Sequence, residues 1–331
     1  MDFSDLIAKL LTGDSRAAAR LITVVENDIK AAEEVINSIY KYTGKAYILG
    51  ITGPPGSGKS TFISTITKLF VDQGKKIGII CVDPSSPLTG GALLGDRIRM
   101  KQHFNLNNVF IRSMANRGQL GGLARATEDT IKILDAFGCD IVIVETVGVG
   151  QSEVDIFKSA HTVVILLVPG LGDDIQAIKA GIIEITDIFV VNKMDLPGAD
   201  NKMTEIEQML ELNMTFKYES REIDRDFSKL AQWTPEIIKV NSKTGENFEE
   251  LLSIIEKHKK FLETTGLIST YLRNRIKSET NQILKHKLTK KVEELISSNK
   301  IIEDYINKVV DKSLDPYSLA NIIIQLLGLE K

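Results

Sequence analysis

A phosphate-binding loop constrains the fold of this chain most strongly, because the motif works only between a strand and a helix. Residues 53–60 read G-P-P-G-S-G-K-S and match the pattern G-x-x-x-x-G-K-S. An apolar, strand-like run at 47–51 precedes the loop, and a helix-like run at 61–66 follows it. The glycines let backbone N–H groups turn inward around anionic oxygens, and the helix N-terminus adds the positive end of its dipole. The loop therefore predicts a nucleotide site.

Two side chains of this loop have expected roles. Lys59 should reach the β- and γ-phosphates of a nucleotide, and the Ser60 hydroxyl should hold Mg²⁺. A Gly-rich turn without function would need neither the lysine nor the hydroxyl. The candidate nucleotide-binding residues of this segment are Gly53, Pro54, Pro55, Gly56, Ser57, Gly58, Lys59, Ser60 and Thr61.

Strands and helices alternate from residue 46 to about 245. The strand candidates are short, rich in Val and Ile, and apolar throughout rather than alternating, which is typical of a parallel sheet buried on both faces. The connections are long enough for crossover helices, so we expect a doubly wound, mostly parallel α/β sheet. The expected strands are 47–51, 77–82, 109–112, 140–145, 162–168, 187–191 and 237–240.

Helical segments flank this region on both sides. Apolar residues recur at helical spacing over residues 1–43, and Asp14 is placed to cap the second of these helices. The pattern is helical again from 246 to the end, where Asp315 and Pro316 should open a last helix. The lysines between 285 and 291 are interpreted as a solvated helix face.

Composition narrows the range of partners and compartments. The net charge of −3 gives no reason to expect nucleic acid or an anionic membrane as partner. No apolar run approaches the roughly 18 residues of a membrane span, and the N-terminus lacks the pattern of a signal peptide. Cys81 and Cys139 lie in or beside apolar runs and read as small buried thiols. We expect a cytoplasmic protein.

A second motif indicates which base the bound nucleotide carries. Asn192, Lys193 and Asp195 form an N-K-x-D sequence at the end of a predicted strand. A carboxylate there accepts hydrogen bonds from the ring N–H and the exocyclic amine of guanine, a pair of donors that adenine lacks. Asn241, Ser242 and Lys243 follow the last strand, where GTP-binding proteins carry a second base loop. In this chain Asn replaces the usual Ser and Ser replaces the usual Ala. We therefore predict GTP and GDP as ligands.

Carboxylates at strand ends suit a hard cation that keeps some of its waters. Glu145 occupies the Asp position of a D-x-x-G-like motif, and the Gly148 N–H can meet the γ-phosphate. Asp83 follows another strand, and Asp96 lies after a Gly-rich stretch. Together with Ser60, these three carboxylates are the candidate Mg²⁺ ligands.

In this order, the motifs resemble the MeaB/ArgK family, the methylmalonyl-CoA mutase-associated GTPases that are grouped with the metal-insertion GTPases. The resemblance covers nearly the whole chain and is most specific between 50 and 195. It implies a homodimeric GTPase that acts as chaperone for an adenosylcobalamin-dependent acyl-CoA mutase, gating cofactor delivery and protecting the mutase. It also implies an N-terminal helical extension at 1–43, a P-loop GTPase domain at 44–262 and a C-terminal helical dimerisation segment at 263–331.

The resemblance also assigns switch residues. Asp96 and Arg99 fall in a first switch loop, where Arg99 could approach the γ-phosphate. Residues 148–153 form the second switch, and residues 169–179, ending at Lys179, form a third that carries the nucleotide state to the partner. Val149 stands where some GTPases place the glutamine that orients water, and Gln151 comes two places later. We therefore expect slow intrinsic hydrolysis that a partner accelerates, with Lys59, Arg99, Glu145, Gln151 and Lys179 as the candidate catalytic or coupling residues.

Three alternatives stay open at this point. A metal-insertion GTPase usually carries His-rich tracts or a Cys-x-x-Cys site, whereas this chain has four dispersed histidines and two isolated cysteines. An ATP-dependent kinase acting on small amino-acid-like substrates conflicts with Lys193 and Asp195, which favour guanine. A protein that binds nucleotide without turnover conflicts with the intact Lys59, Ser60 and carboxylate set.

Overall fold

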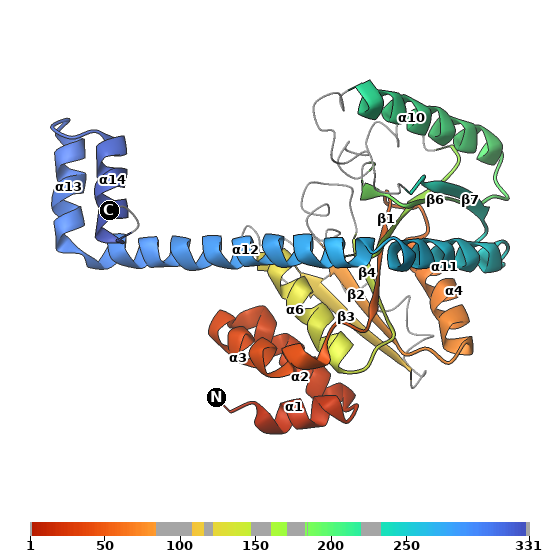
Figure 1. The fold of residues 1–331 in the computed structure, drawn as a ribbon, viewed down its shortest axis with the longest axis horizontal. Helices are drawn as coiled ribbons and strands as arrows, with labels where there is room; N and C mark the ends of the chain where they lie inside the picture. The colour runs from red at the N-terminus through yellow and green to blue at the C-terminus, as the bar shows by residue number, and fades with distance from the viewer. Residues whose placement is uncertain are drawn as a thin grey trace. The chain divides into compact units, whose positions relative to one another are not determined.

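The structure, a computed structural model, describes residues 2–83, 108–115, 122–146, 160–170, 183, 185–219 and 233–328. It divides into two compact units, Met1–Arg275 and Ile276–Lys331. In the first unit, seven strands form one sheet in the order β3-β2-β4-β1-β5-β6-β7, and every pairing is parallel (Figure 1). The strands are β1 (Tyr47–Thr52), β2 (Ile77–Asp83), β3 (Val109–Ala115), β4 (Ile141–Thr146), β5 (Thr162–Leu167), β6 (Ile188–Asn192) and β7 (Glu236–Val240).

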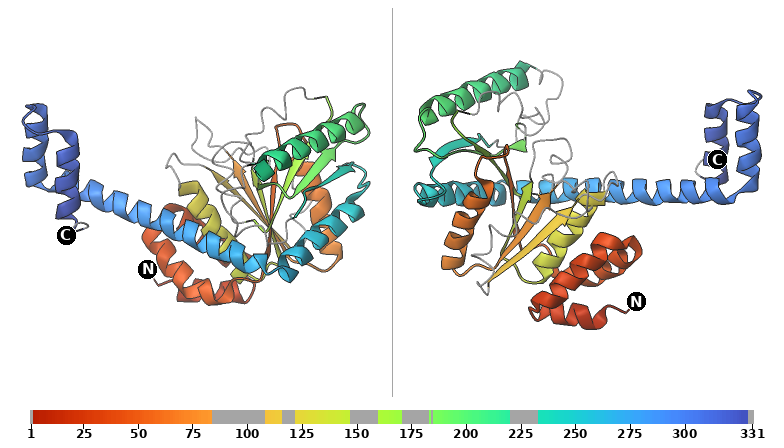
Figure 2. Two further views of the ribbon diagram at one scale, coloured as in Figure 1. Left: turned by 45° about the horizontal axis from the view of Figure 1, so that its top comes forward. Right: turned by 180° about the vertical axis from the view of Figure 1, so that it is seen from behind.

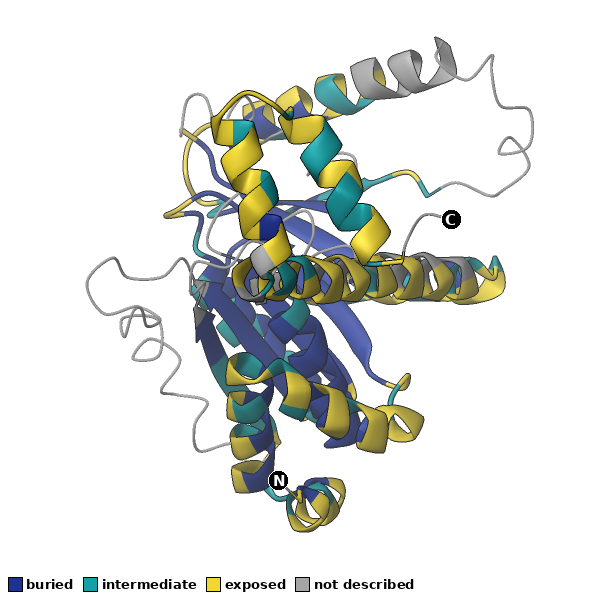
Figure 3. Ribbon diagram, turned by 90° about the vertical axis from the view of Figure 1, so that its left-hand side faces the viewer, coloured by how far each residue is buried: buried dark blue, intermediate teal, exposed yellow. Residues whose placement is uncertain are grey.

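All seven strands lie where the apolar runs predict them. Residues of β1, β4, β5 and β6 are buried along their whole length, as expected of a parallel sheet covered on both faces (Figure 3). Strand β7 lies at one edge of the sheet, and only Ile238 and Val240 of its five residues are buried. The predicted doubly wound, parallel α/β fold is confirmed.

Helices cover both faces of the sheet (Figure 2). One apolar cluster joins the inward side chains of α4 and α11 to one face, for example Phe62 and Phe248 against Ile51. On the opposite face, α6 and the N-terminal helices pack against residues such as Val142, and α10 packs against Ile165 and its neighbours. These helices are α4 (Lys59–Asp72), α6 (Gly122–Ala136), α10 (Ala199–Glu219) and α11 (Phe248–Thr264).

Three helices precede the sheet, as predicted for residues 1–43. They are α1 (Ser4–Leu11), α2 (Ser15–Asn27) and α3 (Ile29–Ile39), followed by the short 3₁₀ helix η1 (Tyr40–Tyr42). The Asp14 carboxylate accepts from the N–H groups of Arg16 and Ala17, which confirms the predicted cap of α2. Buried side chains of α2 and α3 belong to the same apolar cluster as α6, so these helices share a core with the sheet.

The second unit consists of most of helix α12 (Leu267–Ser298) followed by α13 (Lys300–Val310) and α14 (Pro316–Leu326). The Asp315 carboxylate accepts from the N–H groups of Tyr317 and Ser318, so the predicted cap of the last helix is confirmed. Lysines 285, 287, 290 and 291 are exposed, as expected of a solvated face. Many large apolar side chains of this unit are also exposed: Ile276, Ile283, Leu284, Leu288, Ile296, Ile301, Ile306, Val310, Tyr317 and Leu326.

Two further expectations from the sequence concern the two cysteines and membrane-spanning segments. Cys81 and Cys139 are buried free thiols. No helix within the described parts of the chain is long and apolar enough to cross a membrane.

A buried polar network lies at the strand ends opposite the phosphate loop. His258 of α11 is 1% exposed, and its Nδ1 lies 2.7 Å from Thr162 Oγ1, which also contacts the hydroxyl of Tyr47. The other ring nitrogen, Nε2, lies 3.4 Å from Asp187 Oδ1. Trp233, the single tryptophan of the chain, donates from its ring N–H to the Asp187 carbonyl at 2.9 Å. Burial raises the pKa of Asp187 to about 7 and lowers the pKa of His258 to about 4.

We expect the substitution Asp187→Asn to change how stability depends on pH. Because its folded-state pKa is raised, Asp187 contributes stability that is present below its ordinary pKa of 3.8 and lost as pH rises through about 7. His258 acts in the opposite direction, since its lowered pKa gives stability that is lost as pH falls through about 4. The variant keeps only the His258 contribution. The difference in free energy of unfolding between the variant and the wild type should therefore shift by about 2 kcal/mol in favour of the variant as pH rises from 4 to 8.

Urea unfolding followed by Trp233 fluorescence at several pH values measures this difference. The side chain of Asp187 keeps 17% exposure, so the expected gain is smaller than full burial would give. A constant difference between variant and wild type across this pH range would show that Asp187 titrates in the folded protein as it does in water.

Candidate functional site

Three glycines give the phosphate loop its shape. The loop connects β1 to α4, and Gly53, Gly56 and Gly58 all have positive φ, at 151°, 82° and 90°. A Cβ on Gly53 would lie 2.3 Å from the carbonyl oxygen of Leu166, and one on Gly58 would lie 2.6 Å from Asn192 Nδ2. Both contacts are shorter than real Cβ atoms allow, so these positions accept only glycine in this loop.

Lys59 lies beneath this loop at the first position of α4. Its Nζ donates to the carbonyl oxygens of Gly53 at 2.7 Å and Pro54 at 3.1 Å, and the residue is 8% exposed. Two loop carbonyls thus hold the ammonium group where the loop and the helix N-terminus meet. Ser60 is the next residue of the helix and is partly exposed. The positive charge, the helix dipole and the hydroxyl converge on one place, as an anionic phosphate chain requires.

Asn192, at the end of β6, connects the phosphate loop to the base-recognition loops. Its Nδ2 donates to the Ser57 carbonyl at 2.7 Å. Its Oδ1 accepts from the backbone N–H of Ser242 at 3.2 Å and from the Ser242 hydroxyl at 2.7 Å. One buried side chain therefore holds three loops in a fixed arrangement.

Lys193 and Asp195 lie beside this connection. Lys193 has a left-handed backbone with φ of 57°, and its Nζ donates to the Gly56 carbonyl at 2.8 Å. Asp195 is exposed, and its Oδ1 accepts from Asn241 Nδ2 at 3.0 Å. The N-K-x-D residues, the loop at 241–243 and the phosphate loop thus form one hydrogen-bonded frame. The sequence predicted these segments separately, and the structure brings them together.

Glu145 lies on the face of the sheet that is covered by α4, the helix that follows the phosphate loop. It is 3% exposed and is the register partner of Ile51 in β1 and Cys81 in β2. Because strand side chains alternate, Glu145 shares a face with Ile143, which packs in the same cluster as the buried residues of α4. Asp83 is the last residue of β2, two positions beyond the partner of Glu145.

A buried carboxylate at the end of β4, on the face that α4 covers, is of the kind that holds Mg²⁺ with retained waters. Within the described residues, no group of three or more His, Cys, Asp and Glu side chains gathers around one point. The remaining predicted site residues Asp96, Arg99, Gly148, Gln151 and Lys179 lie outside the described residues.

Other residues support the site without having been predicted. The Thr65 hydroxyl of α4 donates to the Ser242 carbonyl at 2.7 Å, across 177 residues of sequence. Thr146 donates to Thr52 at 3.1 Å, joining the ends of β4 and β1 beside the loop. Neither pair has a local sequence signal, because isolated threonines occur in many helices and strands.

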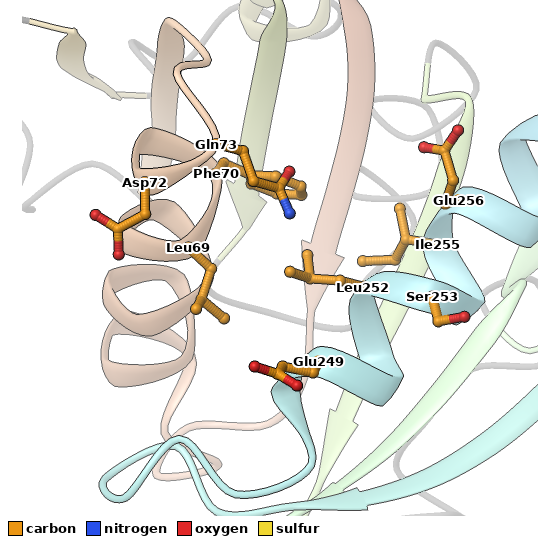
Figure 4. A pocket seen from close by; sticks show the side chains of 9 residues that line it. All are labelled: Leu69, Phe70, Asp72, Gln73, Glu249, Leu252, Ser253, Ile255 and Glu256. Atoms are coloured by element: carbon orange, nitrogen blue, oxygen red, sulfur yellow. The ribbon is translucent and has the colours of Figure 1, made fainter.

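Two cavities adjoin helix α4 on the side of α11. One has a volume of about 750 Å³ and reaches the base loop, with Lys243, Thr244 and Gly245 in its wall. The other, of about 600 Å³, lies between α4 and α11 (Figure 4). Its lining combines apolar side chains, among them Leu69 and Leu252, with three carboxylates. The residues of the phosphate loop and of N-K-x-D line neither cavity, but the first cavity borders the nucleotide frame through Lys243 of the base loop.

The fold and the frame define the class of the protein: a P-loop nucleotide-binding protein built as a GTPase. Comparison with known proteins identifies the family. The family model for the methylmalonyl Co-A mutase-associated GTPase MeaB matches residues 18–297, so the chain belongs to this family of GTPases.

Individual relatives agree with this membership. A Pyrococcus horikoshii protein whose name places it among the GTPases is 51% identical over 321 residues, which are 97% of each chain. The GTPase ArgK of Escherichia coli is 39% identical over 196 residues, covering 58% of this chain and 59% of its own. The crystal structure of an LAO/AO transport system kinase superposes with a TM-score of 0.65 at 23% identity, covering 98% of this chain and 97% of the other, and shows the same fold.

Proposed function

We propose that this GTPase is a Mg²⁺-dependent chaperone of an adenosylcobalamin-dependent acyl-CoA mutase of the methylmalonyl-CoA mutase type. In this role it gates delivery of the cofactor and protects the mutase from inactivation. The observation that carries the proposal is the match of residues 18–297 to a family of mutase-associated GTPases, together with the frame that Asn192 builds between the phosphate loop and the base loop. We place this activity in the cytoplasm.

The chain's own residues supply the binding chemistry. Lys59 neutralises the β- and γ-phosphates, Asp195 accepts from the guanine ring, and Lys193 braces the phosphate loop through Gly56. Ser60, Asp83, Asp96 and Glu145 are the residues that would hold Mg²⁺, which neutralises charge on the β- and γ-oxygens when bound. The position of Ser60 at the helix start and the positions of Asp83 and Glu145 at the strand ends support this assignment.

Hydrolysis should be slow without a partner. Val149 follows Gly148, so the position next to the second switch glycine cannot orient a water molecule. Arg99 or Gln151 would then act in the complex with the partner. The mutase therefore completes the site, and Lys179 of the third switch is the proposed contact that tightens in the complex.

The second unit supports a homodimer. Its helices leave several large apolar side chains exposed, including Tyr317 at 84%, whereas Ile302 is buried. Apolar area of this kind is stabilised by burial against another surface. We assign residues 263–331 as the dimerisation segment, with a second copy of the chain as the occupant, and residues 44–262 as the GTPase domain.

GTP turnover with and without saturating mutase tests the proposal. We expect a large stimulation by the mutase that requires Mg²⁺. Lys179→Ala should leave intrinsic turnover nearly unchanged and reduce the stimulation several-fold, because it removes one charge-assisted contact at the interface. Lys30→Ala, which removes an exposed lysine of α3, serves as the matched control and should behave as wild type. Absence of stimulation in the wild type would contradict the mutase assignment, and equal stimulation of the Lys179 variant would remove Lys179 from the coupling.

A further inference from the structure

Two central strands of the sheet end in threonine. Strand β1 has the sequence Y-I-L-G-I-T and ends at Thr52, and β4 has the sequence I-V-I-V-E-T and ends at Thr146. Thr52 is 0% exposed and Thr146 is 1% exposed. The phosphate loop starts directly after Thr52, and Thr146 directly follows Glu145. Each threonine therefore occupies the end of a strand, beside one part of the nucleotide site.

The two threonines lie in an otherwise apolar row of side chains. Thr146 is the register partner of Val82 in β2. Thr52 is the register partner of Ile165 in β5. Because strand side chains alternate, this row lies on the face of the sheet opposite Glu145, where Val82 and Ile165 belong to the apolar clusters of α6 and α10. Valine would fill the same volume as threonine in this row, so packing alone does not require a hydroxyl there.

One hydrogen bond joins the two hydroxyls. Thr146 Oγ1 donates to Thr52 Oγ1 at 3.1 Å, which links segments that are 94 residues apart in the sequence. A buried hydroxyl is costly unless it is hydrogen-bonded, and a β-branched side chain has few χ1 rotamers to choose from. The bond therefore holds the ends of β1 and β4 at a fixed separation.

We propose that Thr146 is a positioning residue for Mg²⁺ binding: through its bond to Thr52 it holds the end of β4, and with it the Glu145 carboxylate, at a fixed distance from the phosphate loop. This role depends on the proposed function in one respect, namely that Glu145 belongs to the Mg²⁺ site. Mg²⁺ demands near-ideal octahedral geometry with short ligand distances. Its affinity is therefore sensitive to where Glu145 lies relative to Ser60, which follows the loop.

The substitution Thr146→Val tests this role through the affinity for GDP, measured by isothermal titration once in Mg²⁺ and once in EDTA. Valine keeps the volume and the β-branch of threonine and removes the hydroxyl. The affinity in EDTA should stay close to the wild-type value, because the phosphate and base loops are unchanged. We expect the ratio of the affinity in Mg²⁺ to that in EDTA to fall roughly five-fold, the effect of one hydrogen bond. An unchanged ratio would overturn the inference.

Thr146→Ser separates positioning from packing. Serine keeps the donor hydroxyl and removes a buried methyl group, so urea unfolding should show a lower stability than that of the wild type. The Mg²⁺ to EDTA ratio should nevertheless stay near the wild-type value, because the bond to Thr52 can still form. A ratio that falls as far in the serine variant as in the valine variant would show that packing, not the hydroxyl, sets the Mg²⁺ dependence, and the inference would be wrong.

Thr130→Val is the matched control. Thr130 is a buried residue of α6, and its hydroxyl donates to the Ala126 carbonyl at 2.7 Å. This variant also loses a buried hydroxyl bond, but the bond lies within a helix and not between the two strand ends. Its Mg²⁺ to EDTA ratio should equal that of the wild type. A ratio that falls as in Thr146→Val would show that the loss of any buried hydroxyl weakens Mg²⁺ binding, which contradicts a specific role of Thr146.

A double-mutant cycle with Thr52→Val tests the pairing itself. Both single variants remove the same hydrogen bond, one by its donor and the other by its acceptor. The double variant should therefore lose no more of the Mg²⁺ to EDTA ratio than the Thr146→Val variant does. Losses that multiply in the double variant would show that the two hydroxyls act separately and would overturn the pairing.

The wild type separates the two possible failures. If its GDP affinity is the same in Mg²⁺ and in EDTA, the Mg²⁺ site of the proposed function fails, and the role of Thr146 fails with it. If the wild type depends on Mg²⁺ and Thr146→Val keeps the same ratio, only the role of Thr146 fails.

Discussion

Replacing Lys59 with alanine is expected to lower the affinity for GDP and GTP by roughly ten- to hundred-fold while leaving the fold intact. The ammonium group makes charge-assisted contacts with phosphate, which contribute about 1.5–3 kcal/mol. Lys59 lies at the loop, held by the carbonyls of Gly53 and Pro54. Its removal also takes away the donor to the Gly53 carbonyl, whereas the Pro54 carbonyl keeps the N–H of Ser57 at 3.2 Å.

Isothermal titration with GDP measures the loss, and circular dichroism checks that the variant is folded. Lys68→Ala is the matched control, because it removes an exposed lysine from the same helix, α4, away from the phosphate loop. The control should bind GDP as wild type does. A folded Lys59 variant with unchanged GDP affinity would contradict the reading of residues 53–60 as the phosphate site.

The parts of the fold that the sequence predicts are those with local or periodic causes. Strands buried on both faces must be apolar throughout, so their runs of Val and Ile stand out wherever they occur. Asp14 and Asp315 cap helices through N–H groups two and three residues away, which makes their role readable from spacing alone. The phosphate loop is equally local, because its glycines, lysine and hydroxyl are contiguous.

Contacts between distant segments could not be predicted in this way. Asn241 meets Asp195 across 46 residues, and Thr65 meets Ser242 across 177. The network of His258, Thr162 and Tyr47 joins three elements through polar residues that carry no motif. Which residues meet at such places depends on strand order and helix packing. The sequence named Asn241 as a departure from the usual base loop, but only the fold shows what its side chain contacts.

Replacing Asp195 with asparagine is expected to shift base preference from guanine to xanthine. The amide presents N–H groups toward the exocyclic amine of guanine, so GTP affinity should fall roughly 10- to 100-fold, while xanthine offers a carbonyl at that position and should gain relative to guanine.

The structure predicts how the new amide is oriented. Asn241 Nδ2 donates toward the Oδ1 position of residue 195, so the carbonyl of the new amide should face Asn241 and its NH₂ should face the base. The affinities of GTP and XTP for the wild type, for Asp195→Asn and for the double variant with Asn241→Ala measure this effect. Xanthine preference should appear in the single variant and weaken in the double variant, because the second substitution removes the group that orients the amide. If GTP and XTP affinities change together in Asp195→Asn, the carboxylate does not contact the base and the guanine site lies elsewhere in the frame.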